Sequence, residues 1–184
     1  LSGVLHPIYP EVRKYWLSWV DFCVARGADG MDFRVCNHSD RSHEKEEYGF
    51  NAPALKACKT ERIDRDEIAR VNGEAYTEFL LDARDRLKGK GRRINVHVEA
   101  PLLRPSSKDM RWYPNHPHNV DWQWERWIRE IADEVVIRGS YHLRNATHDF
   151  IVDRISRVAH DAGKRVIYQS TIKELEPLKQ GIDT

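Results

Sequence analysis

Hydrophobic residues along the chain follow two spacings that alternate from one segment to the next. From residue 10 to residue 27 they recur every three or four positions, which predicts an amphipathic helix. Pro10 suits the first turn of this helix, and Gly27 suits the position just past its end. We expect its apolar stripe to pack in the core, including the two tryptophans: Val12, Tyr15, Trp16, Trp19, Val20 and Cys23.

Three more helical stripes alternate with short apolar runs. The stripes cover residues 75–87, 120–131 and 151–162, with Asn72, Asn119 and Thr147 as candidate N-caps. Trp124 and Trp127 lie on the second of these stripes and are expected in the core, whereas Trp122 lies off it and is expected to be exposed. The short runs predict strands over residues 30–35, 93–99, 135–138 and 165–169. The order α-β-α-β-α-β-α-β indicates parallel β/α units with right-handed crossovers.

These units predict an α/β fold that is a partial (β/α)8 TIM barrel. Only four strands are evident in 184 residues, and a complete barrel takes at least about 200. The chain starts with a helix and stops soon after a strand, so we expect residues 1–184 to be one unit, the second half of a barrel without its flanking strands. A small open α/β sheet is the competing architecture. The long polar segments after the first two strands favour the barrel, which carries long loops on that side.

Charge and composition narrow the class of protein. The formal net charge of +1 gives no electrostatic case for nucleic acid or for an anionic membrane. No apolar run approaches the roughly 20 residues that span a bilayer, and the first residues do not resemble a secretory leader. We therefore expect a soluble chain, either cytosolic or already freed of a signal. The three cysteines show no CxxC spacing, so neither a disulfide framework nor a zinc site is expected, and no cofactor is predicted.

Polar residues interrupt the first two predicted strands on one face only. Asp32 and Arg34 alternate with apolar neighbours, and so do Asn95, His97 and Glu99. In a barrel these polar side chains point inward, where burying them unpaired would cost several kcal/mol each. Two carboxylates in one cleft are the minimal equipment for hydrolysing a glycosidic bond. The structural alternative is a network in which Asp32 pairs with Arg34 or with a helix terminus.

Two short motifs carry a family resemblance. The chain reads Pro10-Glu11-Val12-Arg13 and then Asp29-Gly30-Met31-Asp32-Phe33-Arg34, which resembles the middle of family-10-like glycosyl hydrolases. Residues 133–136 and 163–166 resemble later segments of that group. The resemblance implies a glycosidase-type barrel, although Arg34 stands where an acidic residue is frequent. The layout is also similar to α-amylase-type barrels, which by position implies a nucleophile at Asp32 and an acid/base at Glu99.

The remaining candidates for the site would bind substrate rather than react with it. Inward arginines can hold a substrate carboxylate or keep Asp32 ionised, and aromatic rings at a barrel mouth commonly stack on sugars. The many histidines show no HExxH-type spacing, which would be a strong signal of a metal site. The candidate substrate-binding residues are Arg34, His38, His97, Trp112, Tyr113, Arg138 and Gln169.

The leading hypothesis is a glycoside hydrolase that cleaves a polysaccharide or oligosaccharide. Glu99 is the candidate general acid/base, and Asp32 is the candidate nucleophile or water-activating base. One alternative is a non-catalytic carbohydrate-binding or scaffolding barrel of a larger protein. Another is a metal-dependent barrel hydrolase or aldolase that uses His97, Glu99 and loop histidines. A carbohydrate is the expected partner, and exposed sheet edges would favour self-association.

Overall fold

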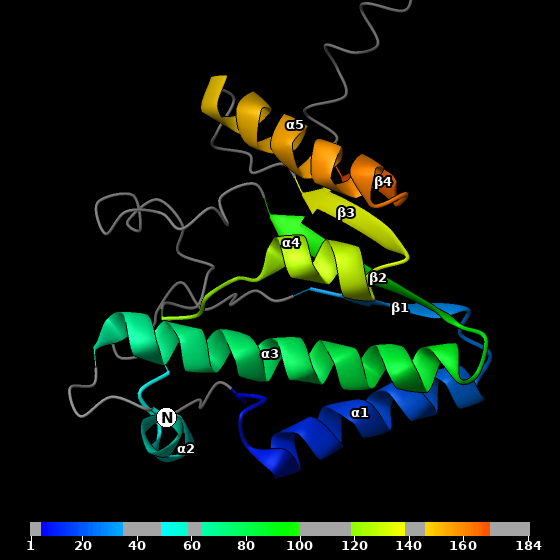
Figure 1. Ribbon diagram of the computed structural model, residues 1–184. Coiled ribbons are helices and arrows are strands. Elements are labelled where there is room, and N and C mark those ends of the chain that lie inside the picture. Colours follow the sequence, from blue (N-terminus) through cyan, green and yellow to red (C-terminus); the bar gives the residue numbers. More distant parts are fainter. Residues whose placement is uncertain (1–4, 35–48, 59–63, 100–118, 139–145, 170–184) are drawn as a thin grey trace, which may run out of the picture.

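The protein has an α/β fold built on one sheet of four parallel strands (Figure 1). The computed structural model describes residues 5–34, 49–58, 64–99, 119–138 and 146–169. The strands pair in sequence order, each with the next along the chain. They are β1 (Gly30–Phe33), β2 (Arg93–Glu99), β3 (Glu134–Arg138) and β4 (Arg165–Gln169). The sequence predicts β2 and β4 with these same bounds.

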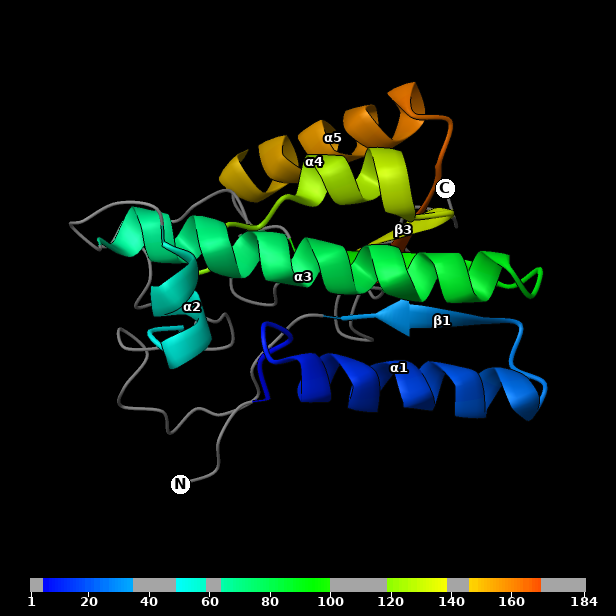
Figure 2. The ribbon, with the colours of Figure 1, turned by 60° about the horizontal axis from the view of Figure 1, so that its bottom comes forward.

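The helices lie side by side over one face of the sheet (Figures 1 and 2). α3 packs between α1 and the pair α4–η4, and α5 packs on η4 and on β4. The short α2 packs against α3. Their bounds are α1 (Pro10–Ala25), α2 (Ala52–Ala57), α3 (Arg65–Lys88), α4 (Trp124–Arg126) with its π-helical continuation η4 (Trp127–Ile131), and α5 (Ala146–Asp161). None of the helices in the described ranges is long and apolar enough to cross a membrane.

The main core lies between these helices and one face of the sheet. Ile94, Val96 and Val98 of β2 are completely buried there, as the alternation along this strand predicts. Trp127 of η4 is also completely buried, and its indole Nε1 donates to Oγ1 of Thr77 at 2.7 Å. A buried indole N–H without an acceptor would cost roughly 1–3 kcal/mol, so Thr77 has a structural role.

The helix α3 begins earlier than the sequence predicts. Its N-cap is Asp64, whose carboxylate accepts a hydrogen bond from Glu67 N at 2.8 Å. Asn72, the predicted cap, is instead buried in the middle of the helix, where its Nδ2 donates to the carbonyl of Asn119 at 2.9 Å. Gly73 stays in the helix because the backbone packs tightly there: a Cβ would lie 2.2 Å from the carbonyl oxygen of Asp121.

The next helix begins later than predicted. Asn119, its predicted cap, has a positive φ of 55° and does not lead into a helix. The first helical residue is Trp124, which is buried as expected. Trp122, expected to be exposed, is partly buried against the rings of Tyr76 and Trp127. The start of this helix and the burial of Trp122 therefore depend more on the packing of aromatic rings than on the helical stripe.

The buried side of α1 also differs from the prediction. Leu17, Val20 and Val24 face the core, toward α3. Trp16 and Trp19, expected in the core, are 43% and 42% exposed, so that prediction is wrong. They lie on a flank of α1 that no described helix covers. A three-and-four spacing places residues on one broad side of a helix but does not say which flank of that side meets a neighbour.

Candidate functional site

Two of the site candidates, Asp32 of β1 and His97 of β2, lie on the face of the sheet that the helices leave open. Met31 and Phe33 pack against the core, and the ring of Phe33 meets that of Phe79 edge-on at 5.7 Å. Asp32 lies between them and points to the opposite face. His97 likewise alternates with the buried valines of β2. The predicted division into an apolar helix side and a polar open side is therefore confirmed for both strands.

A hydrogen bond joins Asp32 and His97 across these two strands. The register pairs Asp32 with Asn95, so His97 lies two residues further toward the carboxyl end of β2. The Oδ2 atom of Asp32 nevertheless reaches the Nε2 atom of His97 at 2.6 Å. The side chain of Asp32 is 49% exposed, and that of His97 is 9% exposed. A solvent-accessible carboxylate is thus held by a buried imidazole.

The second ring nitrogen of His97 has no hydrogen-bond partner within the described part of the chain. This Nδ1 atom is buried. A neutral imidazole carries one N–H and one lone pair, so if Nε2 donates to Asp32, Nδ1 is left as an acceptor. The pair can therefore hold the carboxylate in a fixed orientation. Sequence reasoning proposed both residues separately but did not pair them.

The first residues of the strands carry a separate, structural cluster around Glu134. Its carboxylate accepts a hydrogen bond from Asn95 Nδ2 at 3.3 Å and pairs with Arg93 Nη1 at 3.5 Å. Arg165 of β4 pairs with the same carboxylate. Glu134 is buried, and these partners satisfy its charge. Of the inward polar residues of β2, Asn95 therefore serves the structure, which sequence reasoning did not distinguish.

Three more candidates share one row at the carboxyl end of the sheet. The register pairs Glu99 with Arg138, and Arg138 with Gln169. The side chains of these three residues lie outside the described part of the structure, which gives only their backbone positions. No distance between the carboxyl groups of Glu99 and Asp32 therefore follows from it. The backbone alone separates their rows by four residues, about 13 Å along the strand.

An open groove of about 560 Å³ lies beside β1. Its walls are mostly apolar, from α1, α3 and the helix side of β1. Asp32 and Arg34 contribute its polar part, which places the exposed carboxylate at the border between the groove and the open face of the sheet. Arg34 is partly buried at this position.

Three predicted site residues fall outside the described ranges. They are His38, Trp112 and Tyr113, and their roles stay predictions. Within the described ranges, no group of three or more histidine, cysteine, aspartate or glutamate side chains is arranged to hold a metal ion. Asp32 and His97 alone would supply two ligands.

The comparisons with known proteins give a structural similarity and no sequence match. A scan against protein-family models finds no match, and a search of the curated proteins finds none either. Among solved structures, the chain is similar to catalytic domain 2 of a Group II chitinase from Ostrinia furnacalis, with a TM-score of 0.46 and 11% sequence identity. The match covers 88% of this chain and 39% of the chitinase chain. A similarity this weak assigns no residue and no reaction.

Proposed function

We propose that the four β/α units are the second half of a (β/α)8 barrel and that the protein is a glycoside hydrolase. The strand order 1-2-3-4 and the helices on a single face support the barrel. A doubly wound sheet would instead place helices on both faces and reverse its strand order at a switch point. In barrel enzymes the reacting groups stand at the carboxyl ends of the strands, where the long loops lie.

The observation that carries the proposal is the contact between Asp32 and His97. Both residues come from the carboxyl-terminal part of adjacent parallel strands, on the open face of the sheet. Asp32 is exposed enough to meet a substrate or a water molecule, and His97 fixes its orientation. An oriented, accessible carboxylate is what a glycosidase requires as its base or nucleophile.

Glu99 is the proposed general acid. It lies two residues beyond His97 on β2, so alternation along the strand would place its side chain on the same face as the imidazole. The offset of about 13 Å along the strand is too long for the roughly 5–5.5 Å separation of a retaining enzyme unless both side chains lean toward each other. The separation of about 6.5–9.5 Å in inverting enzymes is easier to reach. We therefore favour inversion, with Asp32 activating water and Glu99 protonating the leaving group.

The remaining candidates would bind the sugar. Arg138 and Gln169 continue the row of Glu99 across the sheet, where they could donate hydrogen bonds to hydroxyl groups. Arg34 directly follows β1, two residues after Asp32, and lines the same groove. Trp112 and Tyr113 would supply stacking surfaces for the sugar rings.

The proposal is tested by measuring the release of reducing ends from a panel of polysaccharides and oligosaccharides. The wild-type chain is compared with Glu99→Gln and with the control Glu130→Gln, which alters an exposed carboxylate of η4. We expect loss of hydrolysis in Glu99→Gln, with glycan binding kept, and normal hydrolysis in the control. Full activity in Glu99→Gln would remove that residue from the mechanism. Glycan binding by the wild type without any hydrolysis would support the non-catalytic carbohydrate-binding barrel instead.

A further inference from the structure

The two edge strands of the sheet each have an open side. Among the described residues, β1 pairs with β2 alone, and β4 pairs with β3 alone. An open parallel edge presents unpaired N–H and C=O groups that another strand can bind. The strands all run in the same direction, so β4 of one molecule can pair in parallel with β1 of another.

Large exposed apolar side chains gather at these two edges. Within the described ranges, nine large hydrophobic residues are exposed, and seven of them belong to the two edge regions. On the β1 side they are Leu5 together with Tyr15, Trp16, Trp19 and Phe22 of α1; on the β4 side they are Ile167 and Tyr168. The remaining two, Phe50 and Leu55, lie at α2. Exposed apolar side chains that gather in this way favour an interaction surface at each edge.

The aromatic flank of α1 is ordered by its own contacts. Tyr15 meets Trp16 edge-on at 5.5 Å, and Trp19 meets Phe22 edge-on at 5.2 Å. Trp16 and Trp19 also form the wall of the groove beside β1, together with Met31 and Phe33. The groove is therefore bordered by α1 and by β1, the strand at the open edge of the sheet.

The positions of the helices relative to the strands indicate what is expected on the open side of β1. In a β/α barrel the helix between two strands covers the boundary between them. Here α3 follows β1 and packs on β2, α4–η4 follows β2, and α5 follows β3 and packs on β3 and β4. α1 precedes β1, so by the same rule it should cover a boundary between β1 and a strand on its open side. Among the described strands, β4 has the other open edge, and it can pair there in the parallel direction.

We propose that a second copy of this chain fills the groove, so that two four-stranded sheets close one eight-stranded barrel. A two-fold axis along the barrel would place β4 of each copy beside β1 of the other, with all strands parallel. α1 would then cover this boundary and bury Tyr168, which lies on the helix side of β4 like Val166. The inference rests on the barrel architecture proposed above.

The apolar surface available is large enough for such an interface. Six side chains, the four aromatics of α1 with Ile167 and Tyr168, are each between 38% and 49% exposed. Aromatic side chains of about 200 Å² each, nearly half exposed in two copies, contribute on the order of 1,000 Å². That is the area at which specific interfaces begin, before the strand pairing and the polar faces are counted.

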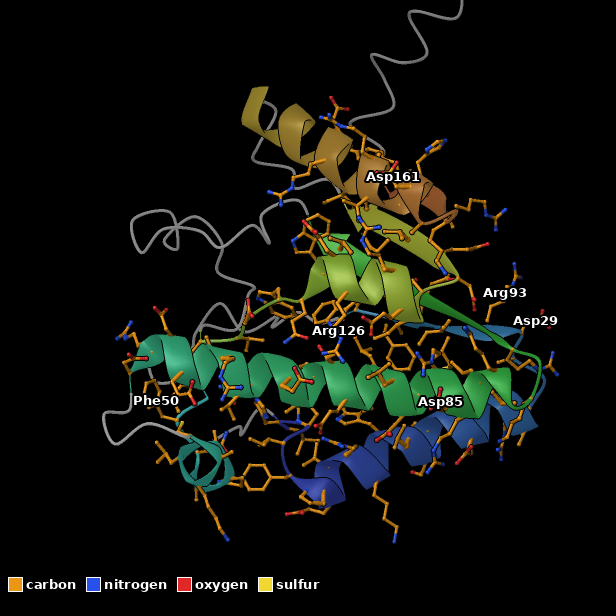
Figure 3. All side chains as sticks on the ribbon, in the orientation of Figure 1. Asp29, Phe50, Asp85, Arg93, Arg126 and Asp161 are labelled. Atoms are coloured by element: carbon orange, nitrogen blue, oxygen red, sulfur yellow. The ribbon has the colours of Figure 1, made fainter. Side chains whose placement is uncertain are left out.

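The test is the molecular mass in solution, measured by light scattering on a sizing column over a series of concentrations. The wild-type chain is expected at about twice the 21.6 kDa of one copy. Trp19→Glu and Tyr168→Lys each place a charge in the boundary and should give monomers. Both side chains are more than 40% exposed, so the variants should keep the helical circular dichroism of the wild type. Phe50→Lys is the control: it charges an exposed apolar residue near α2 and should leave the dimer intact (Figure 3).

Mixing the two monomeric variants identifies the surface. A Trp19→Glu copy keeps an intact β4, and a Tyr168→Lys copy keeps an intact α1. One mixed dimer therefore has one unaltered boundary and one in which Glu faces Lys. We expect mixing to restore the dimer. If either variant unfolds, the pair Trp16→Glu and Tyr168→Arg repeats the test.

Two outcomes overturn the inference. One is a wild-type chain that stays monomeric at every concentration, and the other is a dimer that survives Tyr168→Lys, since it would use another surface. These results are separable from those on the proposed function. A monomer that hydrolyses glycans contradicts the two-copy barrel alone, and a dimer without hydrolysis contradicts the enzymatic assignment alone.

Discussion

Asp32 and His97 lie on neighbouring parallel strands, and the 2.6 Å contact between their Oδ2 and Nε2 atoms joins an exposed carboxylate to a buried ring. The contact crosses the register diagonally, because His97 is two residues beyond the residue that pairs with Asp32. The described hydrogen bond engages Oδ2, so in the proposed mechanism Oδ1 would meet the water molecule.

Changing His97 should reduce the rate of hydrolysis more than the affinity for substrate. In His97→Ala the carboxylate of Asp32 loses its described partner, and a displacement of about 1 Å costs roughly 100-fold in kcat. We expect KM to stay nearly constant. His97→Gln, whose amide nitrogen can replace Nε2 as a donor, should recover part of the loss. A proportional rise in KM, with kcat unchanged, would show that His97 binds the sugar instead.

The stability of the protein should fall in mild acid because of His6. Burial lowers the pKa of this imidazole from 6.5 to about 4. Its Nδ1 atom accepts a hydrogen bond from the backbone N–H of Ile8 at 3.1 Å, which a protonated ring cannot do. Because the folded-state pKa lies below the unfolded-state value, the contribution to stability is complete above pH 6.5 and is lost progressively as the pH falls to about 4.

The measurement for His6 is the free energy of unfolding in urea at a series of pH values. Between pH 6.5 and about pH 4 the wild type should lose roughly 3 kcal/mol more than His6→Asn, whose side-chain oxygen keeps the acceptor without titrating. Equal losses in the two proteins would mean that His6 is not the titrating group. Comparing the two cancels the contribution of the other groups that titrate in the same range.

Replacing Gly73 by alanine should destabilise the protein, although helix propensity alone favours alanine by about 1 kcal/mol. The added Cβ would stand 2.2 Å from the carbonyl oxygen of Asp121, so the backbone must move, at roughly 1–3 kcal/mol. Urea unfolding of Gly73→Ala measures directly whether the free energy of unfolding falls or rises. Lys88→Ala, on an exposed position of the same helix, is the control and should change stability by less than about 0.5 kcal/mol. A stabilised Gly73→Ala would show that the close approach to Asp121 is absent.

The strands were predictable from sequence because polar and apolar residues alternate sharply in them. The bounds of β2 and β4 agree with the prediction, and the open face of β2 is the polar one. The helices were less predictable where tertiary contacts override local signals. Asn72 and Gly73 suggest a helix start in the sequence, but they are buried mid-helix, against the backbone of residues 119 and 121.

The candidate site was predictable as a set of residues but not as an arrangement. Alternation along β1 and β2 assigns Asp32 and His97 to the same face. Their contact joins residues 65 positions apart and depends on the register between two strands, which no local pattern encodes. Asn95 has the same polarity and the same face, yet it bonds to Glu134. The sequence does not separate a structural polar residue from a reactive one when both point into the same sheet face.

The most direct test of the proposed glycosidase is the kcat/KM for glycan hydrolysis by Asp32→Asn relative to Asp29→Asn. Asp29 directly precedes β1, is exposed and pairs with Arg92, so it matches Asp32 in residue type and lies at the opposite end of the strand (Figure 3). Asp32→Asn keeps the size and hydrogen-bonding reach of the side chain but removes the base. We predict a fall of roughly 1,000-fold for Asp32→Asn and near wild-type values for Asp29→Asn. Equal kcat/KM values in the two variants would contradict the assignment of Asp32 to the reaction.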